Sequence, residues 1–177
     1  MDLSREDSTL VLQTDGGRNT GADYVLKVPS GGTVEVESGA ADVEVTGLSG
    51  NVRVLAKAGD VTVHNVGSDV TVESPQGDVA VSDINTETGQ TELEVGSGDV
   101  TLRDMVVGTL EAHVESGDVT LSGCFSGSGR IFVETGDITA NLPPEDTREL
   151  TLETRVGKVV RETPTEDEKR SKGAGGV

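Results

Sequence analysis

The sequence predicts an all-β fold, a single-stranded parallel β-helix (solenoid) with a triangular cross-section. First, Val-x-Val triplets recur every nine residues from Val34 to Val81. Second, a Gly-Asp pair precedes one strand in each coil, at intervals of 18 to 21 residues. Third, a further apolar residue follows five positions after the first valine of that strand. Alternation of apolar and polar residues is typical of a strand with one buried face, and a fixed repeat of such strands is typical of a solenoid.

The N-terminal part is expected to open the first coil. Residues 1–7 are polar and predict a disordered tail, whereas residues 8–14 and 23–30 predict two strands. The solenoid domain is therefore expected to cover residues 8–162. Its regular part begins with six triplets: Val34 to Val36, Val43 to Val45, Val52 to Val54, Val61 to Val63, Val70 to Val72 and Val79 to Val81.

The Gly-Asp pairs continue the repeat through the second half of the chain. The gaps between successive pairs are 18, 21, 19 and 19 residues, so two nine-residue arcs with occasional insertions make one coil, and about seven coils are expected. The general preference for right-handed crossovers favours a right-handed coil, with left-handed triangular solenoids as the alternative. The third apolar column consists of Leu48, Val66, Ile84, Met105 and Cys124.

The C-terminal end is predicted to lack a cap. Leu150 to Leu152 and Val159 to Val160 would close the last coil, and the polar residues 163–177 predict a disordered tail. No amphipathic helix follows the last coil. An uncovered solenoid end offers apolar side chains and unpaired backbone groups to another chain.

The charge is strongly negative, with 32 acidic and 14 basic residues and a formal net charge of −18. Such a chain repels nucleic acid phosphates and anionic membrane surfaces. Salt at about 1 M shortens the screening length to roughly 3 Å and relieves the self-repulsion. The composition therefore indicates a salt-accumulating cytoplasm, as in halophilic archaea; an ordinary acidic surface is the alternative.

The sequence predicts neither a secretion signal nor a transmembrane helix, and it contains a single cysteine. We therefore expect a cytoplasmic protein that reaches the inner face of the membrane only through a partner.

A family resemblance rests on the run from Tyr24 to Gly31 and on the Gly-Asp-Val-x-Val units that follow it. These features resemble the β-strand-repeat family of proposed adhesins over residues 8–162. The coil size and triangular core are also similar to bactofilins, which are polymer-forming β-helix proteins of the prokaryotic cytoskeleton. The resemblance implies a solenoid fold and, on the bactofilin side, a polymer flanked by disordered tails.

Candidate sites for chemistry are few. A column of carboxylates could hold Ca²⁺ or Na⁺, but the Gly-Gly-x-Gly-x-Asp pattern of Ca²⁺-binding β-rolls is missing, so we favour a structural role in which Gly makes a turn and Asp bonds the local backbone. His64 and His113 lie on different arcs, and Cys124 is expected in the core. No cofactor is expected. The carboxylate column consists of Asp60, Asp78, Asp99, Asp118 and Asp137.

The functional hypothesis is a non-enzymatic scaffold that assembles end to end into a bactofilin-like polymer. The alternative is a cell-surface adhesin or a partner-binding module. Expected partners are other copies of the chain or another cytoskeletal protein, with no nucleic acid and no direct membrane insertion. The expected assembly interface consists of Leu10, Val11, Leu12, Leu150, Leu152, Val159 and Val160, and a partner patch is expected at Met105, Phe125 and Phe132.

Overall fold

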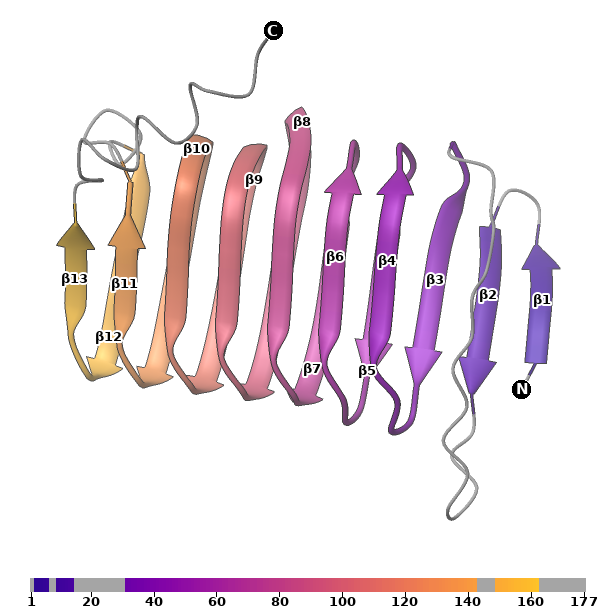
Figure 1. Ribbon diagram of the computed structural model, residues 1–177, viewed down its shortest axis with the longest axis horizontal. Helices are drawn as coiled ribbons and strands as arrows, with labels where there is room; N and C mark the ends of the chain where they lie inside the picture. The colour runs from indigo at the N-terminus through magenta and orange to yellow at the C-terminus, as the bar shows by residue number, and fades with distance from the viewer. Residues whose placement is uncertain (1, 7–8, 15–30, 143–148, 163–177) are drawn as a thin grey trace, which may run out of the picture.

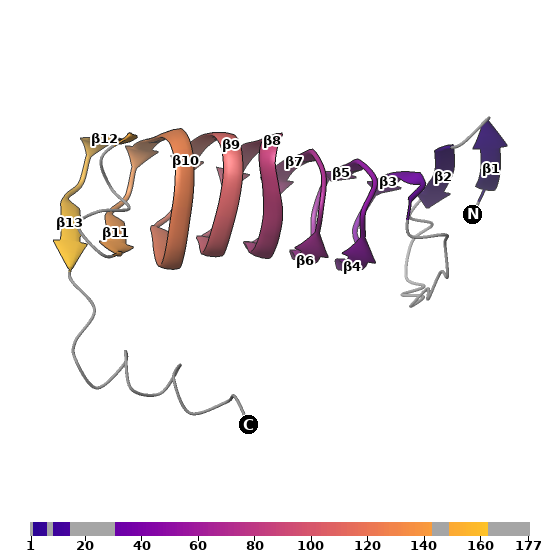
Figure 2. The same cartoon turned by 90° about the horizontal axis from the view of Figure 1, so that it is seen from above.

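The computed structural model describes residues 2–6, 9–14, 31–142 and 149–162. These residues form 13 strands and no helix, wound into a parallel β-solenoid of about 6 turns (Figures 1 and 2). None of them belongs to a helix that could cross a membrane. The predicted fold class is confirmed, with about 6 turns in place of the expected seven.

Two series of parallel strands run along the stack. The first contains β2 (Thr9–Thr14), β3 (Thr33–Ser38), β5 (Val52–Ala56), β7 (Val70–Gln76), the second halves of β8 (Val79–Ser97), β9 (Val100–Ser116) and β10 (Val119–Thr135), and β12 (Leu150–Val156). The second contains β4 (Val43–Leu48), β6 (Val61–Val66), the first halves of β8, β9 and β10, β11 (Ile138–Asn141) and β13 (Val159–Glu162).

The core consists mainly of β-branched and aliphatic residues that align from turn to turn. Val61 lies in register with Val43 on one side and Val79 on the other, and each of the three is at most 8% exposed. β-Branched side chains suit these positions because their restricted rotamers pack well on a pleated surface. The nine-residue spacing therefore predicted the inward-facing positions of both series correctly.

The third apolar column departs from the prediction at Cys124. Leu48, Val66, Ile84 and Met105 are buried as expected, but the residue in register with Met105 is Phe125, which is 2% exposed. Cys124 is exposed. The cause is a register shift between Ser122 and Phe125, where β10 contains one residue more than β9.

The N-terminal end also differs from the expectation of a disordered tail at residues 1–7. A strand, β1 (Asp2–Glu6), pairs antiparallel with β2, and β2 in turn pairs parallel with β3. The strand expected at residues 23–30 and the tail expected at residues 163–177 lie outside the described residues.

Candidate functional site

The Gly-Asp corner is a hydrogen-bonded ladder along the solenoid. In each turn, the backbone N–H of the residue in the Asp column donates to Oδ1 of the Asp one turn earlier, at 2.8–2.9 Å. The first acceptor is Asp42 and the last donor is Lys158. The expected structural role is thus supported, except that each carboxylate bonds the neighbouring turn and not its own local backbone.

The glycine of each pair allows the turns to approach this closely. Gly77 has a φ of 131°, and a Cβ added to it would lie 2.1 Å from the carbonyl oxygen of Gly59. A side chain would therefore meet both an unfavourable backbone conformation and a backbone clash. The Gly-Asp pair consequently holds neighbouring turns together. Glycine allows the close approach of the two backbones, and aspartate makes the cross-turn hydrogen bond.

The carboxylate column carries no metal-binding geometry in the part of the chain that the structure describes. There, no group of three or more His, Cys, Asp or Glu side chains is placed to hold a metal ion. One oxygen of each carboxylate from Asp60 to Asp137 already accepts a backbone N–H. The column is therefore best described as part of the framework.

A second corner, which the sequence interpretation missed, requires left-handed backbone conformations. It lies just before the third apolar column, and the non-glycine members have φ of 52–55°. Asn and Asp tolerate this conformation best after glycine. Aligning the turns on their valines would have revealed it, because the corner is occupied in successive turns by Gly47, Asn65, Asp83, Asp104 and Gly123.

The register shift at Cys124 originates at this corner. Gly123 has a φ of 89°, and the backbone N–H of Cys124 donates to Oδ1 of Asp104 at 3.0 Å. The extra residue moves the cysteine outward and brings Phe125 into the core. The prediction that Cys124 is a core residue is therefore wrong.

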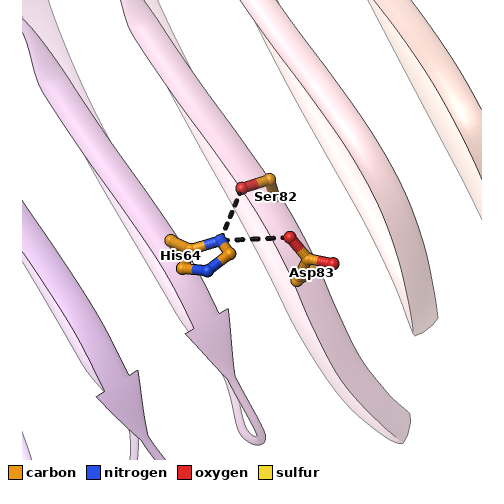
Figure 3. A network of polar contacts seen from close by, with 3 residues as sticks. All are labelled: His64, Ser82 and Asp83. Atoms are coloured by element: carbon orange, nitrogen blue, oxygen red, sulfur yellow. Dashed lines mark hydrogen bonds and ion pairs between the residues drawn. The ribbon is translucent and has the colours of Figure 1, made fainter. Parts of the chain in front are cut away.

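A histidine, a serine and an aspartate meet on the outer surface at the same corner (Figure 3). Nδ1 of His64 lies 3.0 Å from Oγ of Ser82 and 3.0 Å from Oδ2 of Asp83. In a serine-hydrolase triad the serine and the aspartate use different ring nitrogens, whereas here both contacts converge on one. Both the histidine and the aspartate side chains are about half exposed, at 49% and 51%. This arrangement is a solvated polar contact between turns and not a catalytic triad.

The expected partner patch of Met105, Phe125 and Phe132 does not form. Met105 and Phe125 are buried, at 0% and 2% exposure, so neither can meet a partner. Phe132 is half-buried and packs against His113, with ring centroids 5.5 Å apart. Nε2 of His113 lies 4.0 Å from Oε1 of Glu134. What remains of the patch is one aromatic pair on the outward side of the first strand series.

The C-terminal end is the other expected site. Leu150 is buried and Leu152 packs against the core, whereas Val159 and Val160 are 39% and 38% exposed. The large apolar residues that are exposed among those described are these two and Val156, at 61%. Among the described strands, β12 pairs only with β10 and β13 only with β11, so each has one unpaired edge.

The N-terminal part of the expected interface is placed differently. Leu10, Val11 and Leu12 lie on β2, and β2 has a strand partner on both sides. The outermost described strand at this end is β1 (Figure 1). Strand pairing on β2 is therefore already used on both edges, so a contact of another copy with this end would meet β1 first.

The comparison with known families agrees with this architecture. The family model described as Toastrack DUF4097 matches residues 4–176. The chain belongs to the Toastrack DUF4097 family. The match covers all described strands except the first two residues of β1, and the function of the family is unknown. No curated protein and no solved structure gives a significant match.

Proposed function

We propose that this Toastrack solenoid is a non-enzymatic structural scaffold that assembles end to end with other copies of itself. The observation that carries the proposal is the last turn, where β12 and β13 have no second neighbour among the described strands and where Val156, Val159 and Val160 are exposed. Unpaired strand edges with apolar side chains are templates for pairing with another chain.

The two ends of the rod offer edges on the same series of strands. β1 is the outermost described strand at one end and β12 is the last strand of that series at the other (Figure 1). Because β1 runs antiparallel to β2, a copy stacked on β12 through β1 would join the sheets by one antiparallel pairing. A repeated head-to-tail contact of this kind gives an open filament.

The distribution of charge supports a head-to-tail arrangement. Of the described residues, 149–162 contain three basic and three acidic residues, whereas 31–142 contain four basic and 19 acidic residues. A contact through the last turn therefore brings a near-neutral surface, and not the strongly acidic body of the stack, against the next copy. The remaining repulsion requires molar salt, in line with the proposed halophilic archaeal cytoplasm.

The proposal of a non-enzymatic role rests on how the polar side chains are used. Aspartates at two corners bond the backbone of the next turn, and the contacts of His64 converge on one exposed ring nitrogen. A hollow over β3, β5, β7 and β8 opens to solvent and is lined mainly by polar side chains, among them Arg53, Asp69 and Glu92. These features fit a framework better than an active site.

Sedimentation velocity and negative-stain electron microscopy of the full chain in about 2 M KCl would test the proposal, since salt at that level removes most of the self-repulsion. We expect oligomers that lengthen with concentration in the micromolar range. Val160→Asp should shorten them, because it places a carboxylate on β13, which pairs with β11 alone among the described strands. Thr120→Asp is the matched control, since Thr120 is exposed in the same outward column but lies within the stack. A strictly monomeric wild-type chain across this range would refute the proposal.

The alternative is a partner-binding module, a class that includes surface adhesins. The observation in its favour is the pair formed by Phe132 and His113 on the outward side of the stack. Co-purification of one defined partner with a monomeric solenoid, lost on Phe132→Ser, would favour this alternative. Fractionation of cells would separate a cytoplasmic scaffold from a surface adhesin.

A further inference from the structure

Two columns of the repeat change their chemistry together in the last turn. The first is the inward column in which Ala140 is in register with Arg161. Its other members are apolar and at most 6% exposed: Val45, Val63, Val81, Leu102, Leu121 and Ala140. The second is the Asp ladder, where Lys158 replaces the aspartate. In the last turn, each of these columns has a positively charged side chain. In the earlier turns the same positions hold an apolar residue that packs against the next turn or an aspartate that bonds it.

Arg161 lies across the end of the solenoid. Its Nη2 donates to the carbonyl oxygen of Leu150 at 3.4 Å, so the side chain extends from β13 in one series to β12 in the other. The carbonyl of Glu149 accepts the N–H of Gly129 and thus points toward β10. Because successive carbonyls of a strand alternate in direction, that of Leu150 points to the edge of β12 that pairs with no described strand, and a further strand would bind there.

Lys158 cannot make the cross-turn hydrogen bond that a further turn would use. Its backbone N–H donates to Asp137, so it completes the ladder below it. Its side chain has no oxygen to accept an N–H from a following turn. A turn placed beyond β13 would therefore lose the cross-turn bond that every earlier Gly-Asp corner makes.

An inward-pointing charge and a lysine at the edge of a sheet are both means by which proteins prevent pairing between edges, and Lys158 directly precedes the edge strand β13. We infer that Arg161 and Lys158 weaken strand pairing at the C-terminal edge and so limit how strongly a second copy stacks on it. This inference rests on the proposed end-to-end assembly and adds the residues that limit it. For a second copy to pair with β12, the guanidinium must leave the Leu150 carbonyl, which can then accept an N–H from β1 of the incoming copy.

The test compares self-association of the full chain and its variants in about 2 M KCl, where long-range charge effects are screened. Arg161→Val restores the side chain found at the same position in three earlier turns, and Lys158→Asp restores the ladder acceptor. Arg53→Val is the matched control, because it removes the same charge from an exposed position inside the stack. Circular dichroism and thermal melting establish that each variant is folded.

We expect Arg161→Val to associate at an at least tenfold lower concentration than the wild type, Lys158→Asp to shift in the same direction, and the double variant to form the longest rods. Arg53→Val should match the wild type. If Arg161→Val does not fold, Lys158→Asp decides the question alone. If the wild type, Arg161→Val and Lys158→Asp associate equally, the proposed role of Arg161 and Lys158 is refuted. The proposed end-to-end assembly is not refuted by that result. A chain that stays monomeric in the wild type and in every variant would refute the assembly itself, and with it the proposed role of Arg161 and Lys158.

Discussion

The ladder of aspartates at the Gly-Asp corner leads to a prediction that separates hydrogen bonding from charge. Asp99 lies in the middle of the column: Oδ1 of Asp99 accepts the N–H of Asp118, and the N–H of Asp99 donates to Asp78, both at 2.9 Å. Asp99→Asn keeps an oxygen acceptor but removes the charge. Asp99→Ala removes both. The difference between the two variants therefore reports the cross-turn bond, because the change in charge is the same.

The expected size follows from two effects. A hydrogen bond of this kind contributes about 0.5–1.5 kcal/mol to stability, and less of it is lost where water can replace the acceptor. Neighbouring carboxylates separated by about one strand spacing, roughly 5 Å, repel by about 0.8 kcal/mol in water without salt. The charge effect is screened at molar salt, whereas the hydrogen bond is not.

Asp99→Asn should thus raise the free energy of unfolding at low salt and leave it almost unchanged at about 2 M KCl, where the repulsion is screened. Asp99→Ala should be less stable than Asp99→Asn by about 1 kcal/mol under both conditions. Urea denaturation followed by circular dichroism measures both, since urea does not alter ionic strength. If the alanine and asparagine variants unfold at the same urea concentration, the cross-turn bond contributes nothing and the ladder is only a by-product of the turn geometry.

Three further predictions concern the core and its corners. Thr91 is fully buried in register with Val70 and Leu110, and its hydroxyl has no hydrogen-bond partner. Thr91→Val should therefore raise the urea midpoint by the equivalent of about 1–3 kcal/mol. A loss of stability would contradict this account. Phe125→Ala should lower the free energy of unfolding by about 3–5 kcal/mol and Cys124→Ser should leave it almost unchanged, because only the phenylalanine is in the core. Thermal melts that rank the two the other way would support the sequence prediction of Cys124 as the core residue. Gly77→Ala should destabilise by more than 1 kcal/mol or so, since its φ is 131° and its Cβ would meet the Gly59 carbonyl, and a wild-type-like melt would show that the turns can separate there.

The repeat was predictable where it depends on period alone. The alternation from Val34 to Val81 identifies buried positions because a strand side chain can face only one of two ways, and each position then repeats in the next turn. The same reasoning failed at Cys124. There, one extra residue at Gly123 changes which side chain faces inward, and apolar character does not distinguish Cys124 from Phe125.

The candidate sites were less predictable, because they depend on contacts between turns. The sequence identified Asp60 to Asp137 as a column but not the direction of its hydrogen bonds, which is fixed by the offset between stacked turns. By contrast, Arg161 could have been found by aligning the turns, since it follows six apolar residues in one column. The pairing of β1 with β2 has no counterpart in the repeat, and so periodicity could not reveal it.

The Asp ladder also bears on how solenoids of this kind can change length in evolution. Every inner turn accepts one N–H from the following turn and donates one to the preceding turn, so its two faces are complementary and each inner turn fits on any other. Duplication of one repeat, such as the 19 residues from Asp99 to Gly117, would insert a turn that makes the same bonds as its neighbours. The rod would grow by about 4.8 Å, while both terminal turns kept their own sequences. The length of the rod and the properties of its ends can therefore evolve independently.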